Sequence, residues 1–131
     1  MYRSGFNQRY AIGKKNESEI LPKLITYFAR DIQPTINKFD KFDYKCELYN
    51  YDLKSRTNCL KQYPTTMISS NKLETNSVLL FQFTDCLAYI DYNKDKFANY
   101  ETRLFTKYDE PTSHTYIPIK DLKIIEYKSN L

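Results

Sequence analysis

The chain has 131 residues, 41% of them hydrophobic, which suffices for one domain with a single core, and its formal net charge of +4 is compatible with a polyanionic partner without requiring one. Two glycines argue against a glycine-rich phosphate-binding loop, and no apolar run approaches the roughly 18 residues of a membrane span. Three widely spaced cysteines and an N-terminus without an apolar stretch predict an intracellular protein without a disulfide framework. The single histidine, His114, lies among loop-forming residues, which favours a surface imidazole over a partner for a nucleophilic cysteine.

The first predicted element is a helix from about Glu17 or Ser18 to Ala29, preceded by an N-terminal arm of residues 1–13. Asn16 or Ser18 can cap its start. An apolar face with helical spacing is formed by Ile20, Leu21, Leu24, Ile25 and Phe28. We therefore expect this helix to pack against a sheet.

Glu17 is a carboxylate on the apolar side of that helix, because it precedes Ile20 and Leu21 by three and four positions. Two interpretations are open. Glu17 can sit at the rim of the core and interact with the helix dipole, or it can turn toward the sheet and belong to a functional site.

The segment from Lys38 to Arg56 changes to an alternating pattern and predicts two antiparallel strands joined by a tight turn. If the turn centres on Glu47–Leu48, Asp43 lies opposite Asp52. Asp52 and Lys54 then share one face of the second strand, while Leu53 points into the core. Two opposed aspartates repel each other unless a cation lies between them, and hard oxygen ligands of this kind suit Mg²⁺.

The rest of the chain predicts a mixed sheet and an α/β or α+β fold. The remaining elements, in order, are a loop over 57–77 with a short helix begun by Ser69 or Ser70, a central strand over Val78–Phe83, a strand over Cys86–Tyr92, an irregular stretch over 94–113, and a final strand or short helix in the tail 115–127. The nearly continuous apolar character of Val78–Phe83 predicts an interior strand covered on both faces.

Asp43 followed by Asp52-Leu53-Lys54 resembles the PD-(D/E)xK motif of the restriction-endonuclease-like nuclease superfamily. Gly13 through Glu17 matches the Gly-x-x-x-Glu context in which a first-helix glutamate joins that motif. The likeness extends over residues 12–92, and the stretches Asp52–Arg56, Tyr63–Ile68 and Asn71–Lys72 are similar to small nuclease-like proteins of large DNA viruses. Two departures are that Phe42 replaces the motif's proline and that Asp52 replaces the commoner glutamate.

This resemblance implies a single domain over residues 1–131, with an αβββαβ core and mixed central sheet over 14–92 and a C-terminal extension over 93–131. It implies a Mg²⁺ ion, with Mn²⁺ as an alternative, held by Asp43, Asp52 and the Leu53 carbonyl. Lys54 would be the catalytic lysine and Glu17 an accessory acid.

The expected partner is DNA, with no membrane and with a homodimer as an option. Basic residues that could follow a phosphate backbone are Lys14, Lys15, Arg56, Lys61 and Lys72. Three alternatives stay open. The chain could be an inactive nuclease-like protein that binds DNA or virion components, an interaction module that uses its 13 tyrosines, or a fold in which the charged hairpin is only a solvated surface.

Overall fold

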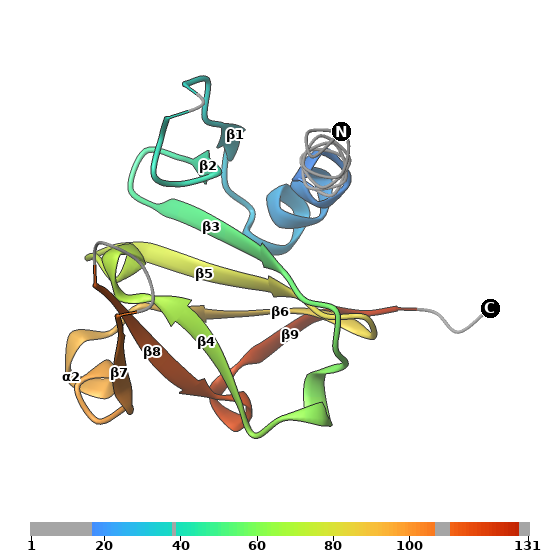
Figure 1. Ribbon diagram of the computed structural model, residues 1–131. Helices are drawn as coiled ribbons and strands as arrows, with labels where there is room; N and C mark the ends of the chain where they lie inside the picture. The colour runs from blue at the N-terminus through green and yellow to red at the C-terminus, as the bar shows by residue number, and fades with distance from the viewer. Residues whose placement is uncertain (1–16, 38, 107–110, 129–131) are drawn as a thin grey trace, which may run out of the picture.

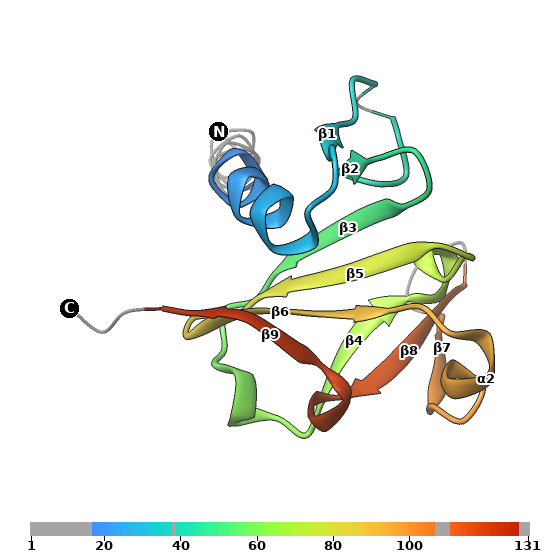
Figure 2. The ribbon, with the colours of Figure 1, turned by 180° about the vertical axis from the view of Figure 1, so that it is seen from behind.

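The computed structural model describes residues 17–37, 39–106 and 111–128. They form a mixed α+β fold that is mostly β, with one main helix, a six-strand mixed sheet and a three-strand antiparallel sheet (Figure 1). The helix covers one side of the large sheet, and the small sheet lies on the other side (Figure 2). The predicted combination of a helix with a mixed sheet is confirmed.

The N-terminal helix is helical over residues 17–28, and Ile20 and Leu24 are its buried residues. Asn16, one of the two predicted caps, lies outside the described residues. The helix ends at Ala29, which takes the left-handed conformation (φ 51°) that glycine usually provides. None of the helices in the described part of the chain is long and apolar enough to cross a bilayer.

The large sheet has the strand order β1-β2-β3-β5-β6-β9, in which β3 and β5 are parallel and the other neighbours are antiparallel. Its strands are β1 (Gln33–Pro34), β2 (Tyr44–Lys45), β3 (Asn50–Ser55), β5 (Ser77–Gln82), β6 (Cys86–Asp91) and β9 (Lys123–Tyr127). Strand β5 lies between β3 and β6 with its residues 78–81 fully buried. The prediction of an interior strand at Val78–Phe83 is therefore confirmed.

The small sheet, ordered β4-β8-β7, was the least predictable part of the fold. It contains β4 (Thr65–Ser69), β8 (Thr112–Pro118) and β7 (Thr102–Phe105). The short helices are η1 (Leu60–Gln62), η2 (Ser70–Lys72), α2 (Lys94–Phe97) and η3 (Ile119–Asp121).

The loop prediction for 57–77 is wrong where β4 forms, and the irregular prediction for 94–113 is wrong where α2 and β7 form. Both strands are short and pair with β8, which is distant in sequence from β4 and follows β7 in the chain.

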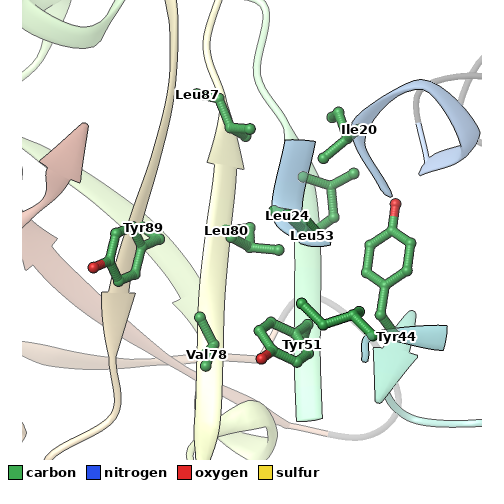
Figure 3. Packing of buried hydrophobic residues seen from close by; sticks show 10 residues of the cluster. Ile20, Leu24, Tyr44, Tyr51, Leu53, Val78, Leu80, Leu87 and Tyr89 are labelled. Atoms are coloured by element: carbon green, nitrogen blue, oxygen red, sulfur yellow. The ribbon is translucent and has the colours of Figure 1, made fainter. Parts of the chain in front are cut away.

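Two hydrophobic clusters cover the two faces of the large sheet. The helix-side cluster contains Ile20, Leu24, Ile32, Tyr44, Tyr51, Leu53, Val78, Leu80, Leu87 and Tyr89 (Figure 3). The cluster on the opposite face contains Leu60, Ile68, Leu79, Phe81, Phe83, Cys86, Ala88, Ile90, Phe97 and Ile117. Because strand side chains alternate, Tyr51 and Leu53 of β3 pack under the helix while Asp52 and Lys54 belong to the opposite face.

Candidate active site

The β2–β3 hairpin places Asp43 beside β3, one residue before β2 begins. Tyr44 pairs with Tyr51 and Lys45 with Asn50, which is the register that a turn centred on Glu47–Leu48 predicts. The Asp43 N–H donates to the carbonyl of Tyr51 (2.9 Å), the residue with which Tyr44 already pairs, so the regular pairing does not continue to Asp43. The predicted register is confirmed over β2, whereas the predicted direct pairing of Asp43 with Asp52 is not part of the observed pairing.

The Asp43 carboxylate lies at the edge of β3, where its Oδ2 accepts the Leu53 N–H at 2.7 Å. The N–H and carbonyl of a strand residue face the same neighbour. Arg56 donates its N–H to the Gln82 carbonyl on the β5 side (2.8 Å). Because successive residues of a strand turn their N–H and carbonyl groups to opposite sides, the groups of Leu53, three positions earlier, face the β2 side and Asp43. A carboxylate and a peptide carbonyl therefore lie on the same edge.

Glu17 and Asp43 both line a cavity of about 160 Å³ beside the N-terminal helix. The cavity is lined by Glu17, Ser18, Leu21, Pro34, Thr35, Asp43 and Tyr44. The Tyr44 hydroxyl donates to the Glu17 carbonyl, which ties the described end of the helix to β2. Glu17 thus turns toward the sheet, as its position on the apolar face predicts.

The two carboxyl groups in this cavity interact directly. Burial raises the pKa of Asp43, the Leu53 N–H opposes that rise, and the charge of Glu17 and its hydrogen bond with Asp43 add to it. The positive charge of Lys54 acts in the opposite direction. Two carboxyl groups that share a hydrogen bond need either a proton or a cation between them when the solution is neutral.

Asp52 is the most buried acidic residue of the candidate site, at 2% exposure. Its Oδ1 lies 3.3 Å from Lys72 Nζ and its Oδ2 lies 3.8 Å from Lys54 Nζ. Within the described residues, Oδ2 is buried and lacks a hydrogen-bond partner. Burial raises the pKa of Asp52, the charges of Lys54 and Lys72 oppose the rise, and Asp43 adds to it.

The structure therefore brings Glu17, Asp43, Asp52 and Lys54 into one electrostatic cluster. Glu17 acts on Asp43, Lys54 acts on both aspartates, and Asp43 acts on Asp52. Among residues 17–37, 39–106 and 111–128, no three Asp, Glu, His or Cys side chains are grouped closely enough to hold a metal by themselves. A metal would need the Leu53 carbonyl and water as further ligands, which suits Mg²⁺ because it usually retains several waters.

The basic residues predicted to contact nucleic acid lie in different surroundings. Lys14 and Lys15 are outside the described residues, and Lys61 is exposed on η1. Arg56 reaches across to the small sheet, where its Nε donates to Thr66 Oγ1 (3.2 Å) and its guanidinium to a main-chain carbonyl. Lys72 contacts Asp52. Arg56 and Lys72 thus have structural partners in addition to any role with nucleic acid.

Two contacts of this site could not be found from sequence spacing. The Lys72 contact with Asp52 joins η2 to β3, and the Tyr44 contact joins β2 to the helix, so each depends on tertiary structure. The only available signal was the presence of Lys72 in the basic run after the motif. No protein-family model, curated protein or solved structure matches the chain, so its site is interpreted from this geometry alone.

Proposed function

We propose that the chain is a metal-dependent nuclease that hydrolyses phosphodiester bonds, with DNA as its substrate. The observation that carries the proposal is the buried Asp52. Its Oδ2 lacks a hydrogen bond among the described residues and lies 3.8 Å from Lys54 Nζ, and the charge of Asp43 acts on the same carboxylate. A buried carboxylate without a full set of hydrogen bonds is costly unless a cation or a function compensates for it. Perturbed carboxyl groups that gather at one point are typical of active sites.

In this proposal Asp43, Asp52 and the Leu53 carbonyl hold Mg²⁺, or Mn²⁺ in its place. The bound ion would stabilise negative charge on the phosphoryl group and lower the pKa of a bound water. The Leu53 N–H holds the Asp43 carboxylate in place through its 2.7 Å hydrogen bond. All three ligands are hard oxygen donors.

Lys54 is the proposed catalytic lysine. Its side chain is 38% exposed, so Nζ is accessible to substrate, and it lies 3.8 Å from Asp52. From that position it can orient the attacking water or neutralise charge on the phosphoryl group. Glu17 is the proposed accessory acid, which acts through its hydrogen bond with Asp43.

We further propose that the helix and strands β1, β2 and β3 form the αβββ part of a restriction-endonuclease-like core. Strand β5, which is parallel to β3, would take the place of the last core strand. The connection between β3 and β5 contains η1, β4 and η2 in the position of the second helix. This correspondence rests on element order and on the position of the acidic residues.

An inactive nuclease-like protein that binds DNA or virion components is the second candidate. The observation that favours it is that two lysines already lie beside Asp52, so part of its charge is balanced without a metal. Such a protein would keep the fold and the binding surface without cleaving its ligand. Metal binding and cleavage distinguish the two candidates.

The test measures thermal unfolding and cleavage of the full chain in Mg²⁺, Mn²⁺ or EDTA, with supercoiled plasmid, single-stranded DNA and RNA as substrates. Nuclease function requires a Tm that rises with metal concentration and metal-dependent cleavage. DNA binding that weakens steeply with salt, without cleavage, would support the inactive candidate. A chain that shows neither metal stabilisation nor binding to nucleic acid would contradict both.

A further inference from the structure

Two lysines of the described chain form ion pairs with Asp52, and Lys72 is the nearer of them. Its Nζ lies 3.3 Å from Asp52 Oδ1, compared with 3.8 Å between Lys54 Nζ and Oδ2. The Lys72 side chain is also less exposed, at 16% compared with 38% for Lys54. The more buried of the two lysines therefore makes the closer contact with the carboxylate.

Further contacts hold the Lys72 ammonium at this point. It donates a hydrogen bond to the main-chain carbonyl of Lys41 and lies 5.5 Å from the centroid of the Phe42 ring. Lys41 in turn forms an ion pair with Glu74, which follows η2. Lys72 thus connects η2 with the segment that leads into Asp43.

The backbone that carries Lys72 is anchored to the small sheet. Ser70 Oγ lies within hydrogen-bond distance of Ser113 Oγ and Thr115 Oγ1 on β8, at 3.0 Å each. The Leu73 N–H donates to the Ser70 carbonyl (3.2 Å) and closes the turn. The position of η2 is therefore fixed independently of Asp52, while the long Lys72 side chain has several rotatable bonds.

We infer that Lys72 is a resident counter-ion that competes with the divalent metal for Asp52. This inference rests on the proposed function and adds a determinant of its metal affinity. One oxygen of Asp52 already contacts the ammonium, and the other is buried without a hydrogen bond among the described residues. A divalent ion bound to Asp52 would lie only a few ångströms from Lys72 Nζ, where like charges repel strongly.

Metal entry therefore requires Lys72 to swing away from Asp52 and give up its bond to the Lys41 carbonyl. The cost of that movement is subtracted from the metal's binding free energy, so the lysine weakens metal affinity. Lys72 also balances Asp52 in the metal-free protein, where an unpaired buried carboxylate would be costly.

The test compares Lys72→Met with the matched control Lys61→Met, which removes an exposed lysine from the similar short helix η1. Binding of Mn²⁺ and Mg²⁺ is measured by titration calorimetry on the full chain. We expect the Kd to fall about tenfold or more in Lys72→Met, because one positive charge near the ion is removed. Lys61→Met should keep the wild-type Kd, and Lys72→Arg, which keeps the charge, should not tighten binding.

Lys72→Gln guards against a folding defect, because its amide can still donate to the Lys41 carbonyl without carrying a charge. It should tighten metal binding as Lys72→Met does, and a cooperative melt in EDTA checks the fold of each variant. If the wild type binds metal and neither neutral variant binds it more tightly, the competition is wrong and the proposed function stands. If neither the wild type nor the neutral variants bind metal, both are wrong.

Discussion

Strands β3 and β5 are parallel neighbours with very different side chains on the same face of the sheet. In their register Asp52 lies beside Leu79, and Lys54 lies beside Phe81. Leu79 and Phe81 are 0% exposed, and Asp52 is nearly as buried at 2%. One strand therefore fills this face with apolar groups, whereas the other places a carboxylate and an ammonium at comparable positions.

This difference separates a strand built for stability from one that carries the candidate chemistry. Leu79 and Phe81 gain free energy from burial. Asp52 does not, since burial raises its pKa even though two lysines oppose the rise. An apolar residue at position 52 would continue the core, so the aspartate indicates a requirement other than stability.

The largest expected effect comes from Asp52→Asn, which is nearly isosteric. If Asp52 holds the metal, cleavage should fall about a thousandfold or more, because the metal contributes several kcal/mol of transition-state stabilisation. The metal-dependent rise in Tm should disappear as well. Plasmid nicking rates and melts in Mg²⁺ measure both, with the exposed Asp91→Asn of β6 as the control. An Asp52→Asn protein that nicks at the wild-type rate would remove Asp52 from the site.

Lys54→Ala should lower turnover about 10²- to 10³-fold, the range found when one transition-state donor is removed. Metal should still bind, because the proposed ligands remain. Single-turnover cleavage combined with metal titration separates the two effects, and Lys94→Ala, at an exposed position of α2, controls for the loss of one surface charge. Wild-type turnover in Lys54→Ala would show that the lysine is not catalytic.

Leu79→Ala tests the other strand in the comparison. Truncating a fully buried leucine should lower the free energy of unfolding by about 2–5 kcal/mol, while any protein that remains folded should keep its metal affinity. Urea denaturation measures the loss. Leu48→Ala, at a position that is 65% exposed, should change stability by less than about 0.5 kcal/mol. If Leu79→Ala and Leu48→Ala lose the same free energy of unfolding, the buried side chains of β5 do not stabilise the fold as proposed.

The smallest effect concerns Asp43 and pH. Because the folded protein raises the pKa of Asp43 above its unfolded value, the folded state binds the proton more tightly. The stability that this provides is present below the unfolded pKa and is lost as pH rises through the folded pKa. Asp43→Asn lacks that loss, and its amide oxygen can still accept the Leu53 N–H.

Without metal, Asp43→Asn should therefore gain stability relative to the wild type as pH rises from 4 to 8. Melts across this range in EDTA measure the trend. A stability difference between the two proteins that stays constant with pH would contradict the raised pKa. Added Mg²⁺ should favour the wild type instead, since only it would keep both carboxylate ligands.

Elements with local signals can be predicted from the amino-acid sequence. The apolar face of the helix over 17–28, the continuous apolar run of β5 and the turn-centred register of β2 with β3 each depend on neighbouring residues. Because side chains alternate between the two faces of a strand, the sequence also predicts that Leu53 lies on the opposite face of β3 from Asp52 and Lys54. Local sequence patterns therefore suffice to name Glu17, Asp43, Asp52 and Lys54 as candidate site residues.

The small sheet and the surroundings of Asp52 depend on contacts between segments that are far apart in the chain. Strand β4 exists because β8 pairs with it, and Lys72 reaches Asp52 because η2 is anchored to β8. The hydrogen bond from the Leu53 N–H to the Asp43 carboxylate likewise requires Asp43 to lie just before β2, beside β3. Such contacts join residues far apart in the chain, so their free energy depends on the assembled sheets and leaves no periodic pattern in the sequence.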